Sequence, residues 1–171
     1  TVYDQHALHE RVLYDKFKAA FENDVEQSEI QSLLIPQSVT LNPGEWETFQ
    51  EAKDIFKTLG FEIEVKDNRV LQILAVPVSL KDTHVRDLIP TVLDEWGEMD
   101  SITADKDLAL AYMACRSAVK AGDRLTSEEV QGLLSQMDSL DEKYTCPHGR
   151  PFKVTLDRKE LDKWFKRSGF D

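Results

Sequence analysis

Near its beginning the sequence reads Asp4-Gln5-His6-Ala7-Leu8-His9-Glu10-Arg11-Val12-Leu13-Tyr14-Asp15, which places two histidines and three carboxylates within twelve residues. If residues 7–21 form a helix, His6 and Glu10 lie one turn apart and project from the same face, at the end of an apolar stripe. Asp4 precedes this helix, where a carboxylate can accept hydrogen bonds from backbone N–H groups or bind a cation. An imidazole and a carboxylate at the edge of a core are typical of a ligand site, and a solvated pair of side chains is the alternative.

The length and composition indicate a globular chain. It has 171 residues, about one domain by length, and 41% of them are hydrophobic, which is enough for a real core. No apolar run approaches the roughly 20 residues that cross a bilayer. The sequence opens at Thr1 with neither an initiator methionine nor a signal-peptide pattern, so we expect a piece of a longer polypeptide.

The charge of the chain limits what it can bind by itself. Its formal net charge is −11 at pH 7, which argues against a high-affinity ligand of duplex DNA acting alone. Clustered carboxylates that bind cations also make a chain acidic, and affinity for DNA can come from another domain or a partner. We therefore expect weak, salt-sensitive DNA binding.

Two cysteines, Cys115 and Cys146, are the remaining soft ligand candidates. In a secreted domain of this size they could form one disulfide. With no disulfide-rich context around either, we favour reduced thiols in a cytosolic protein. Cys146 is followed by His148, which puts a thiol and an imidazole two residues apart. Cys115 by itself would be a buried structural thiol, the commoner case.

Apolar spacing and capping residues predict a mixture of helices and strands. The helix over residues 105–121 is the clearest, and we expect its core face to be formed by Leu108, Tyr112, Cys115 and Val119. A polar stretch over 22–29 is a plausible lobe boundary. Further helices are expected over residues 43–59, over 85–96 with Pro90 inside, and over 126–137 with Val130, Leu133 and Leu134 facing inward. One more helix is expected after a cap at Asp157. Strands are expected over residues 30–41, 61–65, 70–77 and 152–156.

Three motifs carry a resemblance to a known family. The stretch from Asp4 to Asp15 resembles DQHA-x2-E-x4-E, the metal-binding motif of the endonuclease domain of MutL-type mismatch-repair proteins, with Asp15 where the family has Glu. Ala114-Cys115-Arg116 and Cys146-Pro147-His148-Gly149-Arg150-Pro151 resemble two further motifs of that family, in the same order. The resemblance covers most of the chain, from residue 4 to residue 151.

The resemblance implies a zinc site, and the chemistry of the side chains agrees with it. Two thiolates, two imidazoles and one carboxylate suit Zn²⁺ and are too soft for a dedicated Mg²⁺ or Ca²⁺ site. Five ligands exceed the four of one tetrahedral site, so a thiolate shared between two ions is one arrangement. The predicted metal ligands are His6, Glu10, Cys115, Cys146 and His148.

The reaction that the resemblance implies is metal-dependent hydrolysis of a DNA phosphodiester, which nicks one strand. We expect Asp4, His6 and Glu10 to be catalytic. In the family, the position that corresponds to Asp4 is needed for nicking. We assign the thiolate-ligated Zn²⁺ a structural or regulatory role and the hydrolysis to a looser Mn²⁺ or Mg²⁺ near Asp4 and Glu10. His9 should contact solvent or DNA, and Asp15 should matter only if it reaches the metals.

Two surfaces are predicted to bind proteins. Gln31-Ser32-Leu33-Leu34-Ile35-Pro36 resembles the sliding-clamp-binding segment of bacterial MutL proteins, with Gln31, Leu34, Ile35 and Pro36 as the contacts; a plain edge strand is the alternative. An apolar face near the carboxyl terminus corresponds to part of the family's dimer interface, unless it closes the core of its own chain; it is formed by Leu161, Trp164 and Phe165.

The resemblance also implies a setting. The expected partners are a second copy of the chain, double-stranded DNA, the sliding clamp of DNA polymerase and, through the full-length protein, a mismatch-recognition protein, in the cytoplasm and associated with the nucleoid. No membrane is expected.

The predicted fold is α+β in two lobes. Residues 1–28 and 105–171 would form a metal-site and dimerisation lobe, and residues 29–104 an inserted regulatory lobe. The competing function is a non-catalytic zinc-binding scaffold for dimerisation and clamp docking in the same repair system. A zinc-stabilised fold unrelated to DNA is a third hypothesis, against which the order of the motifs argues.

Overall fold

The computed structural model describes residues 1–22, 30–80, 84–99, 102, 106–120 and 122–166. Its helices and strands are mixed along the chain, so the predicted α+β class is confirmed. Apart from Glu22, the polar connector predicted over residues 22–29 lies outside the described residues. The elements are β1 (Val2–Tyr3), α1 (Gln5–Glu22), β2 (Ile30–Thr40), α2 (Pro43–Thr58), β3 (Glu62–Lys66), β4 (Val70–Pro77), α3 (Val85–Gly97), α4 (Lys106–Ser117), α5 (Ser127–Met137), β5 (Lys153–Val154) and α6 (Arg158–Trp164), with short 3₁₀ turns at Asp67–Arg69 and Val78–Leu80.

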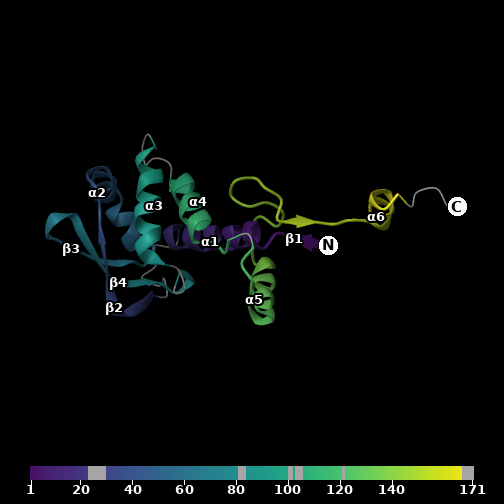
Figure 1. The fold of residues 1–171 in the computed structure, drawn as a ribbon, viewed down its shortest axis with the longest axis horizontal. Coiled ribbons are helices and arrows are strands. Elements are labelled where there is room, and N and C mark those ends of the chain that lie inside the picture. Colours follow the sequence, from purple (N-terminus) through teal and green to yellow (C-terminus); the bar gives the residue numbers. More distant parts are fainter. Residues whose placement is uncertain (23–29, 81–83, 100–101, 103–105, 121, 167–171) are drawn as a thin grey trace.

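Three antiparallel strands form the larger sheet, in the order β2-β4-β3. Strands β3 and β4 form a hairpin, and its turn needs positive φ at Asn68 (59°) and Arg69 (59°). Helices α2 and α3 lie beside this sheet, at the opposite end of the molecule from α6 (Figure 1). The pairing of β2 with β4 is interrupted between Ser32 and Gln37.

Helix α1 is shared by two hydrophobic cores. Its second half contributes Leu13 and Phe17 to the larger core, which also contains the sheet, α2, α3 and α4. Its first half contributes Leu8 and Val12 to a smaller core with Cys146 and the segment around it. The larger core thus contains residues from both sides of the predicted lobe boundaries, and the division into lobes itself stays a prediction.

The prediction of the buried face of α4 is wrong. The residues that this helix buries include Leu110, Met113 and Ala114. Leu108 is 37% exposed, and Tyr112, Cys115 and Val119 are half-buried. Alternating small and large apolar residues made two neighbouring faces similar by pattern, and packing against α1 and α3 selected the other one.

The carboxyl-terminal third contains the other differences. Strand β5 pairs antiparallel with β1 but is only two residues long, shorter than predicted. The predicted capping boxes at Thr126 and Asp157 are confirmed. On α5, Leu133 and Leu134 pack against the smaller core as expected, but Val130 is 40% exposed. Within the described residues, no helix is both long and apolar enough to span a bilayer.

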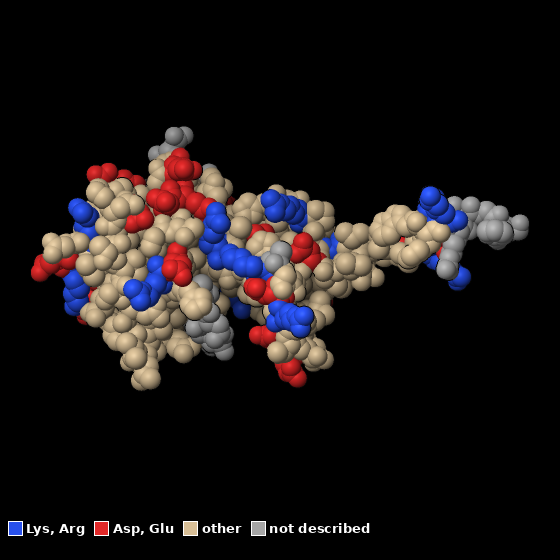
Figure 2. Space-filling view, viewed as in Figure 1, with Lys and Arg blue, Asp and Glu red and all other residues tan. Residues whose placement is uncertain are grey.

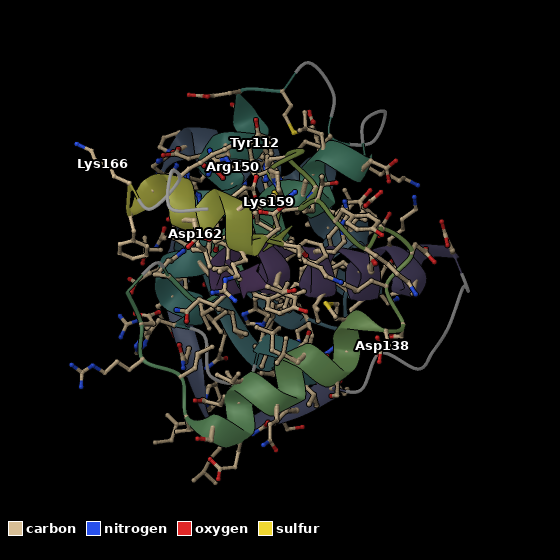
Figure 3. The ribbon with its side chains drawn as sticks, turned by 90° about the vertical axis from the view of Figure 1, so that its right-hand side faces the viewer. Tyr112, Asp138, Arg150, Lys159, Asp162 and Lys166 are labelled. Atoms are coloured by element: carbon tan, nitrogen blue, oxygen red, sulfur yellow. The ribbon has the colours of Figure 1, made fainter. Side chains whose placement is uncertain are left out.

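Helix α6 projects away from the rest of the chain beyond β5 (Figure 1). Every residue of this helix is exposed or half-buried, and Trp164 is 67% exposed. The idea that its apolar face closes the core of its own chain is therefore wrong. Figure 3 looks along the molecule from this side, with Lys159 and Asp162 of α6 in front and Asp138, which caps the end of α5, below.

Candidate metal centre

The carboxylate of Glu10 lies at the centre of the site. Glu10 is only 2% exposed, although it belongs to the second turn of α1. Its Oε1 is 3.1 Å from His6 Nε2, and its Oε2 is 3.7 Å from His148 Nδ1. The side chains of Cys115 and Cys146 also hydrogen-bond to this carboxylate. A buried carboxylate is costly unless it is compensated in this way.

All five predicted metal ligands converge here. Within the described residues, the ligand atoms of His6, Glu10 and Cys115 lie within 4.8 Å of one another, and so do those of Glu10, Cys146 and His148. These five residues come from α1, α4 and the segment after α5, up to 142 positions apart in the sequence. Glu10 is common to both groups, so its carboxylate faces both sets of candidate ligands, and the thiolate shared between two ions stays a prediction.

Two packing features bring the ligands together. Helix α4 packs against α1, and its buried side chains include the small residues Ala111 and Ala114. Cys146 and His148 sit in a tight turn in which Cys146 N–H donates to Arg150 O (2.8 Å) and Gly149 N–H donates to Cys146 O (2.9 Å). Gly149 has φ of 79°, which glycine adopts without steric cost and which this turn requires.

Asp15 does not reach this centre, and its role is to hold the loop that precedes Cys146. Its Oδ1 pairs with Arg11 Nη1 at 3.2 Å, and its Oδ2 accepts from Asp141 N–H at 3.3 Å. Arg11 Nε donates in turn to Thr145 O at 2.9 Å. Sequence analysis missed Arg11, for which the only available signal was its oppositely charged partner four residues later.

The two histidines of α1 bind the same residue, Val119, one through its C=O and the other through its N–H. His6 Nδ1 lies 2.8 Å from Val119 O, and Val119 N–H donates to His9 Nδ1 at 3.1 Å. A carbonyl oxygen only accepts, so His6 Nδ1 carries a proton; an N–H only donates, so His9 Nδ1 carries none. The expectation that His9 contacts solvent or DNA is wrong for this nitrogen. The remaining side of His9 lines a surface cavity of about 820 Å³ beside α4 and α5.

The tautomer of His6 is the one that a metal requires. With its proton on Nδ1, His6 turns the lone pair of Nε2 towards Glu10 Oε1 at 3.1 Å. Two acceptors at this distance need a cation between them, either a second proton or a metal ion. This geometry, the two thiols and His148 together fit Zn²⁺.

Asp4 lies at the edge of the centre. Its Oδ1 accepts from His6 N–H (2.9 Å) and Ala7 N–H (3.1 Å), so the predicted capping role at the start of α1 is confirmed. Asp4 is exposed and belongs to neither of the two ligand groups. The Asp4 carboxylate therefore lies beside the positive end of the α1 dipole and is open to solvent.

The acid–base properties of the ligands reflect their burial. Burial by itself raises the pKa of Glu10, but hydrogen bonds from the two cysteines and the charges of the two imidazoles outweigh it, so the pKa lies below its ordinary value. Burial, with the neighbouring Glu10, raises the pKa of Cys115 to about 11. Burial also raises the pKa of Cys146. Without a metal the thiols are protonated and donate to Glu10, and a bound ion takes the place of these protons.

Two further residues lie outside the centre. Arg116 pairs with Glu95 of α3 (Nε to Oε1, 2.8 Å), and its charge also acts to lower the pKa of Cys115. His84 is exposed at the start of α3.

The segment predicted to bind the sliding clamp protrudes from β2. Residues 33–36 lie opposite Leu74 alone, because Ser32 pairs with Ala75 and Gln37 with Ile73. Leu34 is 98% exposed and Ile35 is 76% exposed. Gln31 and Pro36 are exposed as well.

Comparison with known proteins identifies the class. The model of the family described as "MutL C terminal dimerisation domain" matches residues 1–125. The chain belongs to this family.

Three relatives named "DNA mismatch repair protein MutL" match nearly all of the chain. The protein from Clostridium botulinum (strain Kyoto / Type A2) is 41% identical over 168 residues, which are 97% of this chain and 25% of the relative. Those from Heliobacterium modesticaldum and Pelodictyon phaeoclathratiforme are 38% identical over 169 residues (96% of this chain, 25% of the relative) and 36% identical over 170 residues (97% and 26%). The chain thus spans about a quarter of the length of these curated relatives.

Asp15 offers a first test of how the centre is supported. We expect Asp15→Asn to lower the free energy of unfolding by about 1–3 kcal/mol, because it weakens the pair with Arg11 and the bond from Asp141. Asp15→Glu, which keeps the charge, should lose less. Urea unfolding gives the free energies, and hydrogen exchange should show faster exchange of the Asp141 amide in Asp15→Asn.

A matched control lies on the same helix. Lys18 and Glu22 are also four residues apart but are 38% and 63% exposed, 3.9 Å from each other. Glu22→Gln should change the free energy of unfolding by less than about 0.5 kcal/mol. Equal losses in Asp15→Asn and Glu22→Gln would contradict the assigned role of Asp15.

Proposed function

We propose that this chain is the endonuclease and dimerisation region of a DNA mismatch-repair protein and that it nicks one strand of duplex DNA. The observation that carries the proposal is the convergence of five metal-type side chains on the buried carboxylate of Glu10. The printed names of the relatives support the assignment to mismatch repair. The two-lobe organisation, with residues 29–104 as a regulatory insertion, belongs to the same proposal, as does a cytoplasmic, nucleoid-associated location.

The side chains at this centre would have two different roles, one in holding Zn²⁺ and one in hydrolysis. Glu10, His6, Cys115, Cys146 and His148 would hold Zn²⁺ in a structural or regulatory role, since thiol ligands bind it tightly. A hard ion, Mn²⁺ or Mg²⁺, would bind at the edge of the centre, between the exposed Asp4 and the buried carboxylate of Glu10, where it would supply an activated water and stabilise the leaving oxygen. Asp4 would orient that water, and His6, fixed by Val119, would keep its Nε2 towards the shared carboxylate.

Delivery of DNA would depend on partners. The chain carries a net charge of −11, and on the face in Figure 2 its basic and acidic side chains are interspersed without one continuous basic band. Binding of duplex DNA by this chain alone would be weak and sensitive to salt. In the full-length protein, other domains, the sliding clamp and a mismatch-recognition protein would supply the affinity and the site.

The competing function is a zinc-binding scaffold that dimerises and docks on the clamp without cutting. The observation that favours it is that the two ligand groups consist of thiols, imidazoles and Glu10, while Asp4 stands outside both. The nicking experiment separates the two functions.

Asp4→Asn tests the proposed catalytic carboxylate. Asn caps a helix about as well as Asp, so this change removes the charge and keeps the hydrogen bonds to His6 N–H and Ala7 N–H. We expect the rate of nicking of supercoiled plasmid in Mn²⁺ to fall by roughly 10–100-fold, with the zinc content unchanged.

Asp157→Asn is the matched control, because Asp157 is the N-cap of α6 and lies outside the centre. It should nick at the parent rate. Nicking by Asp4→Asn at the parent rate with equal zinc would refute the catalytic role of Asp4. No nicking by the parent protein, even at high concentration and low salt with the clamp added, would favour the scaffold or a requirement for the rest of the polypeptide.

Clamp docking is tested at the protruding segment of β2. Replacement of both Leu34 and Ile35 by Ala should weaken binding to the sliding clamp at least about tenfold, because these side chains are the apolar anchors. The free energy of unfolding should stay within about 0.5 kcal/mol of the parent value, because both side chains are exposed. Val65→Ala, at a residue of β3 that is 47% exposed, is the control and should bind normally; equal binding by all three proteins would exclude this segment.

Homodimerisation is proposed through the projecting α6. Its apolar face is exposed in one copy of the chain. The family model describes a dimerisation domain, which supports dimerisation itself, but its match ends at residue 125, before α6. Trp164→Ala should raise the dimer dissociation constant at least about tenfold, measured by sedimentation equilibrium, since buried Trp is a common anchor of interfaces. Val65→Ala should dimerise like the parent, and an unaltered dissociation constant in Trp164→Ala would show that the interface lies elsewhere.

A further inference from the structure

The motif from Asp4 to Asp15 leaves residues 8 and 9 unspecified, yet His9 is tied to the metal centre. It lies one turn of α1 beyond His6 and is half-buried, with burial, followed by the charges of Lys16 and His6, holding its pKa below the ordinary value. Its Nδ1 accepts from Val119 N–H at 3.1 Å. The C=O of the same residue, which belongs to the next peptide group, holds His6 Nδ1 at 2.8 Å.

The N–H and the C=O of Val119 belong to two successive rigid peptide planes that meet at its Cα, so once a bond fixes the first plane only the φ and ψ of Val119 orient the second. The segment from Ala118 to Lys120 leaves the end of α4 and is exposed at Lys120. It has no strand or helix of its own to fix its orientation, and the bonds to His6 and His9 place it against α1. Gln5 Nε2 adds a third bond from α1, to Asp123 O at 2.8 Å.

We propose that His9 is a positioning residue of the metal centre: by accepting from Val119 N–H, it keeps the segment after α4 in the place where Val119 O can hold His6 with its Nε2 towards Glu10. The proposal rests on the proposed metal site and names a residue that supports it. His9 touches neither the metal nor the DNA; it acts through Val119 and His6.

The chemistry predicts a graded effect of substitution. Partners that orient a metal-ligating histidine are usually carbonyls or carboxylates, and their loss weakens metal binding by roughly 10–100-fold. His9 acts one bond further from the metal, so the low end of that range is expected. The requirement is for an acceptor at the place of Nδ1, which Asn can meet with its side-chain oxygen and Leu cannot.

The experiment measures Zn²⁺ affinity by competition with a chromophoric chelator. We expect His9→Leu to bind Zn²⁺ roughly tenfold more weakly and His9→Asn to bind within about threefold of the parent. His84→Leu is the matched control, because His84 lines the same cavity and makes no side-chain cap hydrogen bond. It should bind as the parent does. Urea unfolding of the metal-free proteins accompanies the titrations, so that a folding defect is recognised.

A second measurement tests the link to His6 without metal. Nitrogen-15 chemical shifts of the imidazole in metal-free protein report which ring nitrogen carries the proton. The Nδ1–H form of His6 should persist in His9→Asn and lose population in His9→Leu. Parent-like zinc affinity and parent-like His6 shifts in His9→Leu would overturn the proposal, and so would equal losses in His9→Leu and His84→Leu. If the parent bound no zinc, the proposed metal site would fail, and the His6 shifts would still decide the role of His9.

Discussion

The burial of one carboxylate is the constraint on which the rest of this structure depends. Glu10 is almost inaccessible, and a charge in such a place must be compensated by donors or cations. The chain supplies two thiols and two imidazoles from three separate segments. Each of these segments is held in turn by contacts that have no other evident purpose, such as Arg11 to Thr145 O and His6 to Val119 O. The compensation of Glu10 therefore determines where α4 and the Cys146 turn must lie relative to α1.

Helix α1 transmits this constraint to both cores. The same helix places Leu8 and Val12 in the smaller core and Leu13 and Phe17 in the larger one. Close-packed protein interiors tolerate little displacement, so a movement of α4 along α1 would disturb the larger core as well as Cys115. The fold and the cluster of candidate ligands are thus stabilised by the same helix–helix contact, which would pre-organise the ligands for an ion.

Local sequence patterns predicted much of the secondary structure correctly, and they failed where contacts between distant segments determine which residues are buried. His6 and Glu10 could be predicted because they are four residues apart on one helix, and the capping boxes at Thr126 and Asp157 because they are local motifs. The convergence of the five ligands was implied by resemblance, and no spacing rule could supply it across 142 positions. Other features depend on neighbours that are distant in the sequence. The predictions for the buried face of α4 and for Val130 were wrong, and the hydrogen bonds to Val119 were not predicted.

The surfaces proposed for dimerisation and clamp docking are physically separate from the centre. Trp164 lies on the projecting α6, and Leu34 and Ile35 lie on a bulge of β2 at the other end of the molecule (Figure 1). Their side chains are exposed, so the core does not depend on them. An acidic chain gains little from DNA alone, whereas the two proposed docking surfaces would raise the local concentration of DNA at the centre through a partner. On this argument the geometry of the proposed centre is fixed by the fold, and access to the substrate would depend on the exposed apolar residues.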